Sequence, residues 1–317
     1  MNIFEFLGLP ANHRAINKTT QLVKHWDEVP ESRRKKGFAI QTKKDGVCSL
    51  TLIHHGHASI WSRTGKRFTN TSNLVTRISR LELPDGVYMG EMCCSSVSLE
   101  VLSGAVNPNR VNPLKDELCL VPCLLEMHFF DLVTVDEFIA GRSFTPFVDR
   151  VNNLGVNHLI ASAQGRSLIS IIRYSTADSH EEIANELDHA ITNGEEGIVI
   201  RDPDADWEAG HKGWRVMKMV RGVDYDLRCI GFEEGKGKYT GKVANLIFGW
   251  KDGKTIKCML GKGYTHSMAA SMFNDMDTPN SAVGKIFQVY ALEESSKGKL
   301  RLPKVGELRH DKGEADV

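Results

Sequence analysis

Short strand-like runs, each followed by a turn rich in glycine, aspartate, asparagine or proline, recur along most of this chain and constrain its fold more than any other feature. Such runs, rich in β-branched and aromatic residues, predict β-strands. Before residue 222 they cover residues 38–42, 48–53, 57–61, 87–93, 124–133, 168–174 and 197–201. A helix is predicted from Ser179, with Glu182 three residues later as a capping box, to Asn193-Gly194. We therefore expect a mixed α+β region with mainly antiparallel sheets, preceded by a polar, helix-like segment that ends near residue 35.

After about residue 222 the pattern changes to closely spaced strands separated by glycine- and lysine-rich turns. Strands are predicted at residues 227–232, 243–250, 255–260 and 285–292, with one short helix near residues 268–273. Four or five short strands in about 90 residues are typical of a small all-β barrel of the oligonucleotide-binding (OB) type. Because 317 residues are many for one hydrophobic core, we expect two domains, at residues 1–222 and 223–317.

Charge and cysteine content narrow the functional classes. The chain has 40 basic and 40 acidic residues, but some basic side chains are clustered, as in the turns at 235–242 and 297–304. Such clusters favour a polyanionic partner only modestly. The seven cysteines are odd in number and contain no CxxC pair, which predicts reduced thiols in an intracellular protein. No apolar run approaches the ~18 residues of a membrane span, and the first residues do not have the pattern of a secretory signal.

One short motif, Lys43-Lys44-Asp45-Gly46, is able to supply a covalent nucleophile. It places a lysine at the end of a predicted strand, directly before a tight turn. Attack on phosphorus requires a neutral amine, which burial or neighbouring cations favour. Taken alone, the tetrapeptide is better explained as a surface hairpin turn. Residues 249–255 resemble a phosphate-binding P-loop, but only three residues separate their glycines where four are required.

Further motifs accompany Lys43 in a fixed order. They are Ser62-Arg63-Thr64-Gly65, Gly90-Glu91, Phe129-Phe130-Asp131, residues 196–201, residues 213–218 and Arg309-His310-Asp311-Lys312. Each is short, but their order and their places on predicted strands and turns make chance a poor explanation. Through these motifs the chain resembles the covalent nucleotidyltransferase superfamily over nearly its whole length, and specifically the ATP-dependent DNA ligases. Residues 284–289 and 298–303 are similar to the OB domain of the same family.

The resemblance implies a role for each motif residue. Lys43 would attack the α-phosphate of ATP and form a lysyl-AMP intermediate, with Asp45 and Lys218 completing the catalytic set. The residues that would bind ATP are Gln41 at the adenine amino group, Phe130 stacked on the base, Glu91 at the ribose, Arg63 and Lys218 at phosphate oxygens, Glu196, and Arg309, Asp311 and Lys312 near the pyrophosphate. Glu196 and Glu91 would hold Mg²⁺ or Mn²⁺, because such ions take one or two carboxylates beside phosphates. Phe129 is expected in the core.

The resemblance also implies a substrate. The chain is expected to seal 5′-phosphate/3′-hydroxyl nicks in duplex DNA through lysyl-AMP and adenylated DNA, as a monomer that clamps or encircles the duplex. The basic turns would hold the DNA backbone irrespective of sequence. A barrel on a hinge near residues 221–224 would close for the first step and open for DNA. With no room before residue 37 for an all-helical DNA-encircling domain, the chain looks like a minimal two-domain ligase, as found in viruses and as bacterial accessory enzymes.

Two positions depart from the family pattern. Cys48 stands where the first motif usually has arginine, and Val216 stands where the fifth usually has the first of two lysines. Three alternatives therefore remain open: an RNA ligase, an mRNA-capping guanylyltransferase-like enzyme and a non-catalytic nucleic-acid-binding relative. An NAD⁺-dependent ligase is disfavoured because its accessory modules are missing from the sequence.

Overall fold

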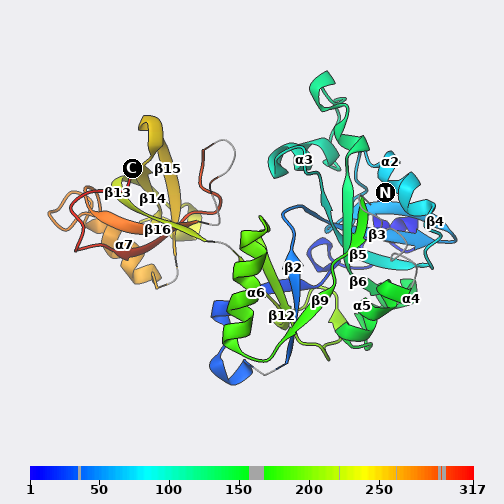
Figure 1. Cartoon of the computed structure of the whole chain (residues 1–317). Helices are drawn as coiled ribbons and strands as arrows, with labels where there is room; N and C mark the ends of the chain where they lie inside the picture. The colour runs from blue at the N-terminus through cyan, green and yellow to red at the C-terminus, as the bar shows by residue number, and fades with distance from the viewer. Residues whose placement is uncertain (35–36, 157–167, 221, 262, 292–293, 295–297) are drawn as a thin grey trace. The chain divides into compact units, whose positions relative to one another are not determined.

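The computed structural model describes residues 1–34, 37–156, 168–220, 222–261, 263–291, 294 and 298–317. The chain divides into two compact units, unit 1 (Met1–Val220) and unit 2 (Arg221–Val317). Unit 1 mixes helices with sheets and unit 2 is built mainly from strands (Figure 1), which confirms the expected α+β class. Residues 292 and 297, at the ends of two predicted segments, lie outside the described residues.

The described residues of unit 1 form two five-stranded sheets and one two-stranded sheet. The first sheet has the order β1 (Leu22–His25), β12 (Lys212–Val220), β10 (Gly197–Arg201), β2 (Phe38–Lys43) and β9 (Tyr174–Ala177). The second has the order β4 (His57–Ser62), β3 (Val47–His54), β5 (Gly86–Cys93), β6 (Glu126–Val133) and β8 (Ile169–Ile171). The third pairs β7 (Arg142–Ser143) with β11 (Trp207–Glu208). The predicted mainly antiparallel pairing is confirmed, with parallel pairs at β1–β12 and β6–β8.

The turn after Lys43 connects strands of different sheets. In the first sheet β2 is hydrogen-bonded to β10 and β9, whereas in the second β3 is hydrogen-bonded to β4 and β5. The predicted hairpin at Asp45-Gly46 is therefore wrong, because both edges of β2 pair with strands from much later in the chain. The two-residue hairpin turn lies instead at His55-Gly56, between β3 and β4, where both residues have positive φ (49° and 74°).

Helices cover the sheets and bury their apolar faces. Figure 1 shows α6 (His180–Thr192) lying along the first sheet, where Ile183 packs in one core with Ile40 and Ile198. The predicted start of α6 is confirmed, because the Ser179 side chain accepts a hydrogen bond from the Glu182 backbone. Residues of α2 (Ser72–Ser79) and α3 (Leu99–Val106) pack on one face of the second sheet. Residues of α1 (Ile3–Phe6) and α4 (Val135–Ala140) pack on its other face, and α5 (Phe147–Val156) contacts β6.

The first 34 residues contain less helix than predicted. Besides α1 and β1 they hold short 3₁₀ turns at Ile16–Lys18, Trp26–Glu28 and Glu31–Arg33. Residues 22–25 are extended because they pair in parallel with β12, at the edge of the first sheet. This long-range pairing outweighs the local helix preference of the segment, which is a weak influence.

Unit 2 is a closed five-stranded barrel, as predicted. Its strands follow the order β13 (Val223–Glu234), β14 (Val243–Gly249), β15 (Thr255–Leu260), β17 (Lys304–Leu308) and β16 (Ile286–Ala291). The unpredicted β17 closes the barrel by pairing in parallel with β15 and antiparallel with β16. The core includes Leu246 and Phe248, and α7 (His266–Asn274) packs Met272 and Phe273 against it. Among the described residues, none of the helices is long and apolar enough to cross a lipid bilayer.

Candidate active site

A pocket of about 540 Å³ in unit 1 is lined by residues from both five-stranded sheets. Its volume suits a small-molecule ligand. The predicted site residues that line it are Gln41 and Lys43 of β2, Arg63 after β4, Glu91 of β5, Phe130 of β6 and Lys218 of β12. Segments far apart in the sequence therefore contribute their predicted residues to one cavity.

Strand register explains how the first sheet presents its polar residues. Gln41 lies opposite Val199, and Val199 lies opposite Lys218, so these residues form one row across β2, β10 and β12. Since side chains alternate between the faces of a strand, Lys43 shares the face of Gln41. Ile40 points to the other face and packs in the core with α6. One alternation pattern thus produces both the core and the pocket wall.

The second sheet combines core and pocket on one face in the same way. Cys48 lies opposite Glu91 in the β3–β5 ladder, and both line the pocket. On the same face Leu50 and Leu52, further along β3, are fully buried in the core. In β6 the expected division also holds, because Phe129 is buried in the core while Phe130 lines the pocket.

Two adjacent lysines face two adjacent glutamates at the end of β2. The Lys43 Nζ donates a hydrogen bond to the Glu196 carboxylate, and the Lys44 Nζ donates one to Glu195. The Glu196 backbone N–H also donates to the Lys43 carbonyl, at 3.1 Å. Asp45 is exposed and does not line the pocket. The pairing brings the predicted nucleophile into contact with a predicted metal ligand.

Gly46 is required by the close approach of β5. A Cβ atom at this position would lie 2.6 Å from both the Cys93 Sγ and the Met92 carbonyl oxygen. Its backbone N–H also donates a hydrogen bond to the Glu91 carboxyl group. The turn after Lys43 therefore holds Glu91 in place at the pocket.

The pKa of Glu91 is raised to about 7, chiefly by burial and also by the neighbouring carboxylates of Glu196 and Asp45, against the opposing effect of Lys43. Glu91 at the pocket is therefore repelled by the nearby carboxylates of Glu196 and Asp45, and a cation would relieve this repulsion. An all-oxygen set of one or two carboxylates suits Mg²⁺ or Mn²⁺, which complete their coordination with water and phosphate oxygens. Glu91 and Glu196 fit the predicted metal site in this respect.

The two departures from the family pattern both lie on the pocket wall. Burial, with Glu91 next in effect, raises the pKa of the Cys48 thiol to about 12, so this thiol is neutral at pH 7. Val216 lines the pocket, whereas the neighbouring Arg215 forms ion pairs with Asp206 (2.9 Å) and Glu208 (3.0 Å). Arg215 therefore does not replace the missing lysine.

A buried polar network supports the pocket and was not predicted. The Arg201 Nε donates to the Gln41 Oε1 at 3.0 Å, and its guanidinium lies 3.6 Å from Asp131. Asp131 also accepts two hydrogen bonds, of 2.8 and 3.0 Å, from Arg150. Burial lowers the pKa of Arg201 to about 10, although Asp131 opposes this shift. The Arg201 guanidinium also lies 5.4 Å from the centre of the Phe130 ring.

This network fixes the orientation of the Gln41 amide. The Gln41 Nε2 donates to the Ile172 carbonyl (2.7 Å) and to the Phe130 carbonyl (3.2 Å). Both of its N–H groups are used, so only an Oε1 lone pair can face a ligand, and that atom accepts from a donor such as an amino group. The sequence feature that could have revealed this network is the presence of two charged residues, Asp131 and Arg201, inside otherwise apolar strand patterns. No such feature marks Arg150.

The remaining predicted residues form a cluster within unit 2. The Arg309 guanidinium donates to both oxygens of Asp226 (2.9 and 3.0 Å) and to both oxygens of Asp311 (3.0 and 2.8 Å). Lys312 lies 3.3 Å from the Asp226 carboxylate. The hydrogen bond from Arg309 lowers the pKa of Asp311 to about 2. Asp226, buried in β13, is the member of this cluster that sequence analysis missed.

Comparisons with known proteins place this geometry in context. Residues 19–219 match the family described as the ATP dependent DNA ligase domain, and residues 234–309 match the DNA ligase OB-like domain. A probable DNA ligase of Anaeromyxobacter dehalogenans is 38% identical over 251 residues, which cover 77% of this chain and 47% of the relative. A DNA ligase of Methanopyrus kandleri is 27% identical over 216 residues, covering 61% of this chain and 37% of the relative. The matched regions span less than half the length of these two relatives.

Solved structures agree with the fold. One described as Pmar-Lig_Pre. superposes with a TM-score of 0.76 at 22% identity, covering 93% of this chain and 68% of that one. Another, from a study of DNA binding with a minimal scaffold in Lig E DNA ligases, gives a TM-score of 0.63 at 16% identity, covering 92% and 98%. At these identities the likeness concerns the fold alone. The match over residues 19–219, however, covers more than half of the sequence, and the chain therefore belongs to the ATP-dependent DNA ligase domain family.

Proposed function

We propose that this chain is an ATP-dependent DNA ligase that seals 5′-phosphate/3′-hydroxyl nicks in duplex DNA through lysyl-AMP and adenylated DNA. The observation that carries the proposal is the Lys43 amine, hydrogen-bonded to Glu196 beside a pocket that Arg63 and Lys218 also line. A nucleophile, a carboxylate and two cations in one cavity suit nucleotidyl transfer better than binding alone. Membership of the ligase domain family supports the same activity.

In the first step Lys43 forms the lysyl-AMP. Its Nζ attacks the α-phosphorus of ATP, the bond from that phosphorus to the bridging oxygen breaks, and pyrophosphate leaves with the electron pair. The attacking nitrogen also loses a proton, which Glu196 is placed to accept. Arg63 and Lys218 stabilise the charge on the nonbridging oxygens, as cations do in phosphoryl transfer.

The adenine lies against Phe130, whose ring offers a flat apolar surface. The free lone pair of the Gln41 Oε1 accepts from the adenine amino group, while Arg201 holds this amide in place. Glu91 accepts from the ribose hydroxyls. Glu91 and Glu196 are the residues that hold Mg²⁺ or Mn²⁺, and such an ion neutralises phosphate charge.

In the later steps AMP passes from Lys43 to the 5′-phosphate at the nick, and the 3′-hydroxyl then displaces AMP. Arg309, Asp311 and Lys312 act in the first step, where they orient the pyrophosphate. For this, Arg309 exchanges its carboxylate partners Asp226 and Asp311 for phosphate oxygens.

The protein works as a monomer that clamps nicked DNA, and basic side chains such as Lys238 and Lys242 contact the DNA backbone without reading sequence.

The test is the sealing of a singly nicked, 5′-phosphorylated DNA duplex with Mg²⁺, with ATP and NAD⁺ supplied separately and a nicked RNA duplex alongside. We expect sealing of DNA with ATP alone. Sealing of RNA only would favour the RNA ligase alternative, and covalent labelling with GTP in place of ATP would favour the capping-enzyme alternative. Labelling with ATP but no sealing would mean that Cys48 and Val216 mark a different acceptor. No covalent labelling at all would contradict the proposal in favour of a non-catalytic relative.

A further inference from the structure

Three histidines lie at the β3–β4 hairpin, at the end of β3 remote from the pocket. His54 ends β3, His55 and Gly56 form the two-residue turn, and His57 begins β4. Both turn residues have positive φ, which two-residue turns of this type require and which favours asparagine or glycine. Turn geometry explains Gly56, and it also accommodates His55, since histidine is among the side chains enriched at positive φ.

The carboxylate of Asp85 lies directly against this turn. Asp85 precedes β5, and its oxygens accept hydrogen bonds from the backbone N–H groups of His55 (2.8 Å) and Gly56 (3.2 Å). The carboxylate is thus held in position by the backbone and retains lone pairs for a further partner.

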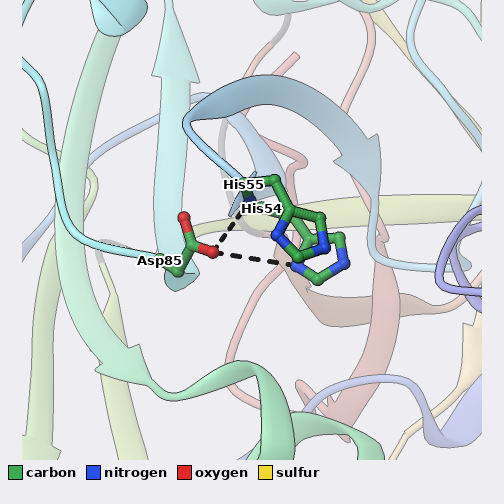
Figure 2. Close-up of side chains that lie close together, drawn as sticks. All are labelled: His54, His55 and Asp85. Carbon is green, nitrogen blue, oxygen red and sulfur yellow. Dashed lines mark hydrogen bonds and ion pairs between the residues drawn. The ribbon is translucent and has the colours of Figure 1, made fainter.

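The two histidine rings complete a compact group around this carboxylate. Figure 2 shows the rings of His54 and His55 side by side, with centres 4.0 Å apart, next to Asp85. The Nδ1 of His54 lies 3.9 Å from the Asp85 Oδ2, too far for a hydrogen bond. This nitrogen is buried and has no hydrogen-bond partner among the described residues. A buried polar atom without a partner calls for an explanation, and an absent ion is one.

The distances in this group suit a metal ion. One ligand atom from each of His54, His55 and Asp85 lies within 4.8 Å of the other two. Bonds of about 2.0–2.2 Å to zinc place two tetrahedral ligands roughly 3.4 Å apart. The group must close by up to about 1.4 Å to reach that spacing, and two of its three side chains, His55 and Asp85, are exposed. Imidazole nitrogen with one carboxylate is a donor set typical of zinc-type ions, whereas Mg²⁺ and Ca²⁺ prefer oxygen alone.

We propose that His54, His55 and Asp85 form a second metal site, which takes a divalent transition metal of the zinc type with water in the remaining position. This site is independent of the proposed ligase activity. Cys48 at the pocket lies six residue steps along β3 from His54, a span of about 20 Å in a strand. The metal joins the tip of the β3–β4 hairpin to the start of β5. It thereby ties together three neighbouring strands of the second sheet.

The test is a titration of chelator-treated full-length protein with Co²⁺, followed by the visible absorption that this ion gains in a site of low coordination number. Zn²⁺ is then added as a competitor, and excess Mg²⁺ is present throughout. We expect one equivalent of Co²⁺ to bind, Zn²⁺ to displace it, and the thermal midpoint of the protein to rise with saturation. Because loss of an outer-shell partner alone weakens metal binding about 10–100-fold, His54→Ala should weaken it at least as much.

Two further variants make the result specific. His55→Asn places the residue that the turn prefers at positive φ, so it should fold at least as well as the wild type and still lose Co²⁺. His57→Ala removes an exposed histidine of the same hairpin that lies outside the group, and it should keep the wild-type affinity. The proposal is overturned if the wild type binds no stoichiometric Co²⁺, if His55→Asn binds it as tightly as the wild type, or if His57→Ala abolishes binding.

Discussion

Cys48 of β3 lies directly opposite Glu91 of β5, so a charged side chain at position 48 would shift the pKa of the Glu91 carboxyl group. An arginine at this position, as the family usually has, would place a cation beside Glu91 and lower its pKa. A thiol supplies no cation, and because burial raises the pKa of Cys48 to about 12, it is neutral rather than anionic at pH 7. Burial is the main cause of the pKa of about 7 at Glu91, and Cys48 opposite brings no cation that would lower it.

This pKa predicts how stability depends on pH. The folded pKa of about 7 exceeds the ordinary value of 4.5, so between these values the folded state binds more protons than the unfolded state. The free energy of unfolding should therefore fall as pH rises from 4.5 to 7. Glu91→Gln removes this contribution, and at pH 8 it should be more stable than the wild type by on the order of 3 kcal/mol, at about 1.4 kcal/mol per pKa unit.

Urea unfolding of both proteins between pH 4.5 and 8 measures this difference. The two free energies of unfolding should approach each other toward pH 4.5, where Glu91 is protonated in the folded state and half protonated in the unfolded state. A constant offset between wild type and variant across the whole range would contradict the assigned pKa.

The assignment of Lys43 as the nucleophile makes a second prediction. Lys43→Ala should reduce covalent labelling by ATP more than roughly 10³-fold, because removing a covalent nucleophile removes the step itself. Lys44→Ala is the matched control, since this neighbouring lysine pairs with Glu195 rather than Glu196. Labelled protein digested to peptides identifies the modified residue. Labelling that persists in Lys43→Ala at Lys44 would show that the assignment is wrong.

For single residues, the sequence predicted the side chains that line the pocket better than the side chains that hold them in place. Lys43 and Gln41 could be placed because the family resemblance assigns both to the nucleotide, and the two-residue spacing between them puts them on one face of a strand. Arg150 could not be placed, because its partner Asp131 lies on another element and only the fold brings the two together. Asp226 was missed for the same reason, since Arg309 reaches it from 83 residues away.

Among the elements, the turn between β2 and β3 shows where local patterns mislead. Asp45-Gly46 between two strand-like runs is a strong hairpin signal. The signal reports a tight turn correctly, but it does not reveal which strands pair. That outcome depends on β9 and β10, which pair with β2 from more than a hundred residues later. Short strands such as β17 escaped prediction because their pattern is weak without their neighbours.

The close packing around this turn leads to a third prediction. Gly46→Ala places a methyl group 2.6 Å from the Met92 carbonyl oxygen, so the backbone must shift. We expect a loss of roughly 1–3 kcal/mol in the free energy of unfolding, as for overpacking elsewhere, together with weaker labelling by ATP. Gly104→Ala, in α3 of the same unit, is the control because nothing lies within 4 Å of its added methyl group. If both variants unfold like the wild type in urea, the close approach at Gly46 has no energetic importance.

For the molecule as a whole, the cluster around Arg309 links unit 2 to the proposed reaction. Because we propose that the arginine acts in the first step only, Arg309→Ala should lower labelling by ATP roughly 10²-fold, as for loss of one charge-stabilising donor. Sealing of DNA that already carries the 5′-adenylate should fall much less. Lys257→Ala, a surface lysine of the same barrel that pairs with Glu233, should leave both rates unchanged.

Single-turnover assays of the two steps separate these effects. Equal losses in adenylation and in sealing of pre-adenylated DNA would contradict a role confined to the first step. A melting curve of Arg309→Ala checks that the variant is folded. We expect it to be, because Lys312 still lies beside the buried Asp226 when Arg309 is removed.

The pairing of β2 with strands near residue 200 also affects the order in which the protein can be made. A ribosome releases the chain from its N-terminus, and β3, β4, β5 and β6 can form their sheet once residue 133 has emerged. Lys43, by contrast, cannot pair with Glu196 until that residue, 153 positions later, has been synthesised. At about 5–20 residues per second, the delay between the two residues is on the order of ten seconds. A nascent chain thus contains half of its nucleotide site well before the other half exists. ATP binding during translation would accordingly report completion of the first sheet, not of the second.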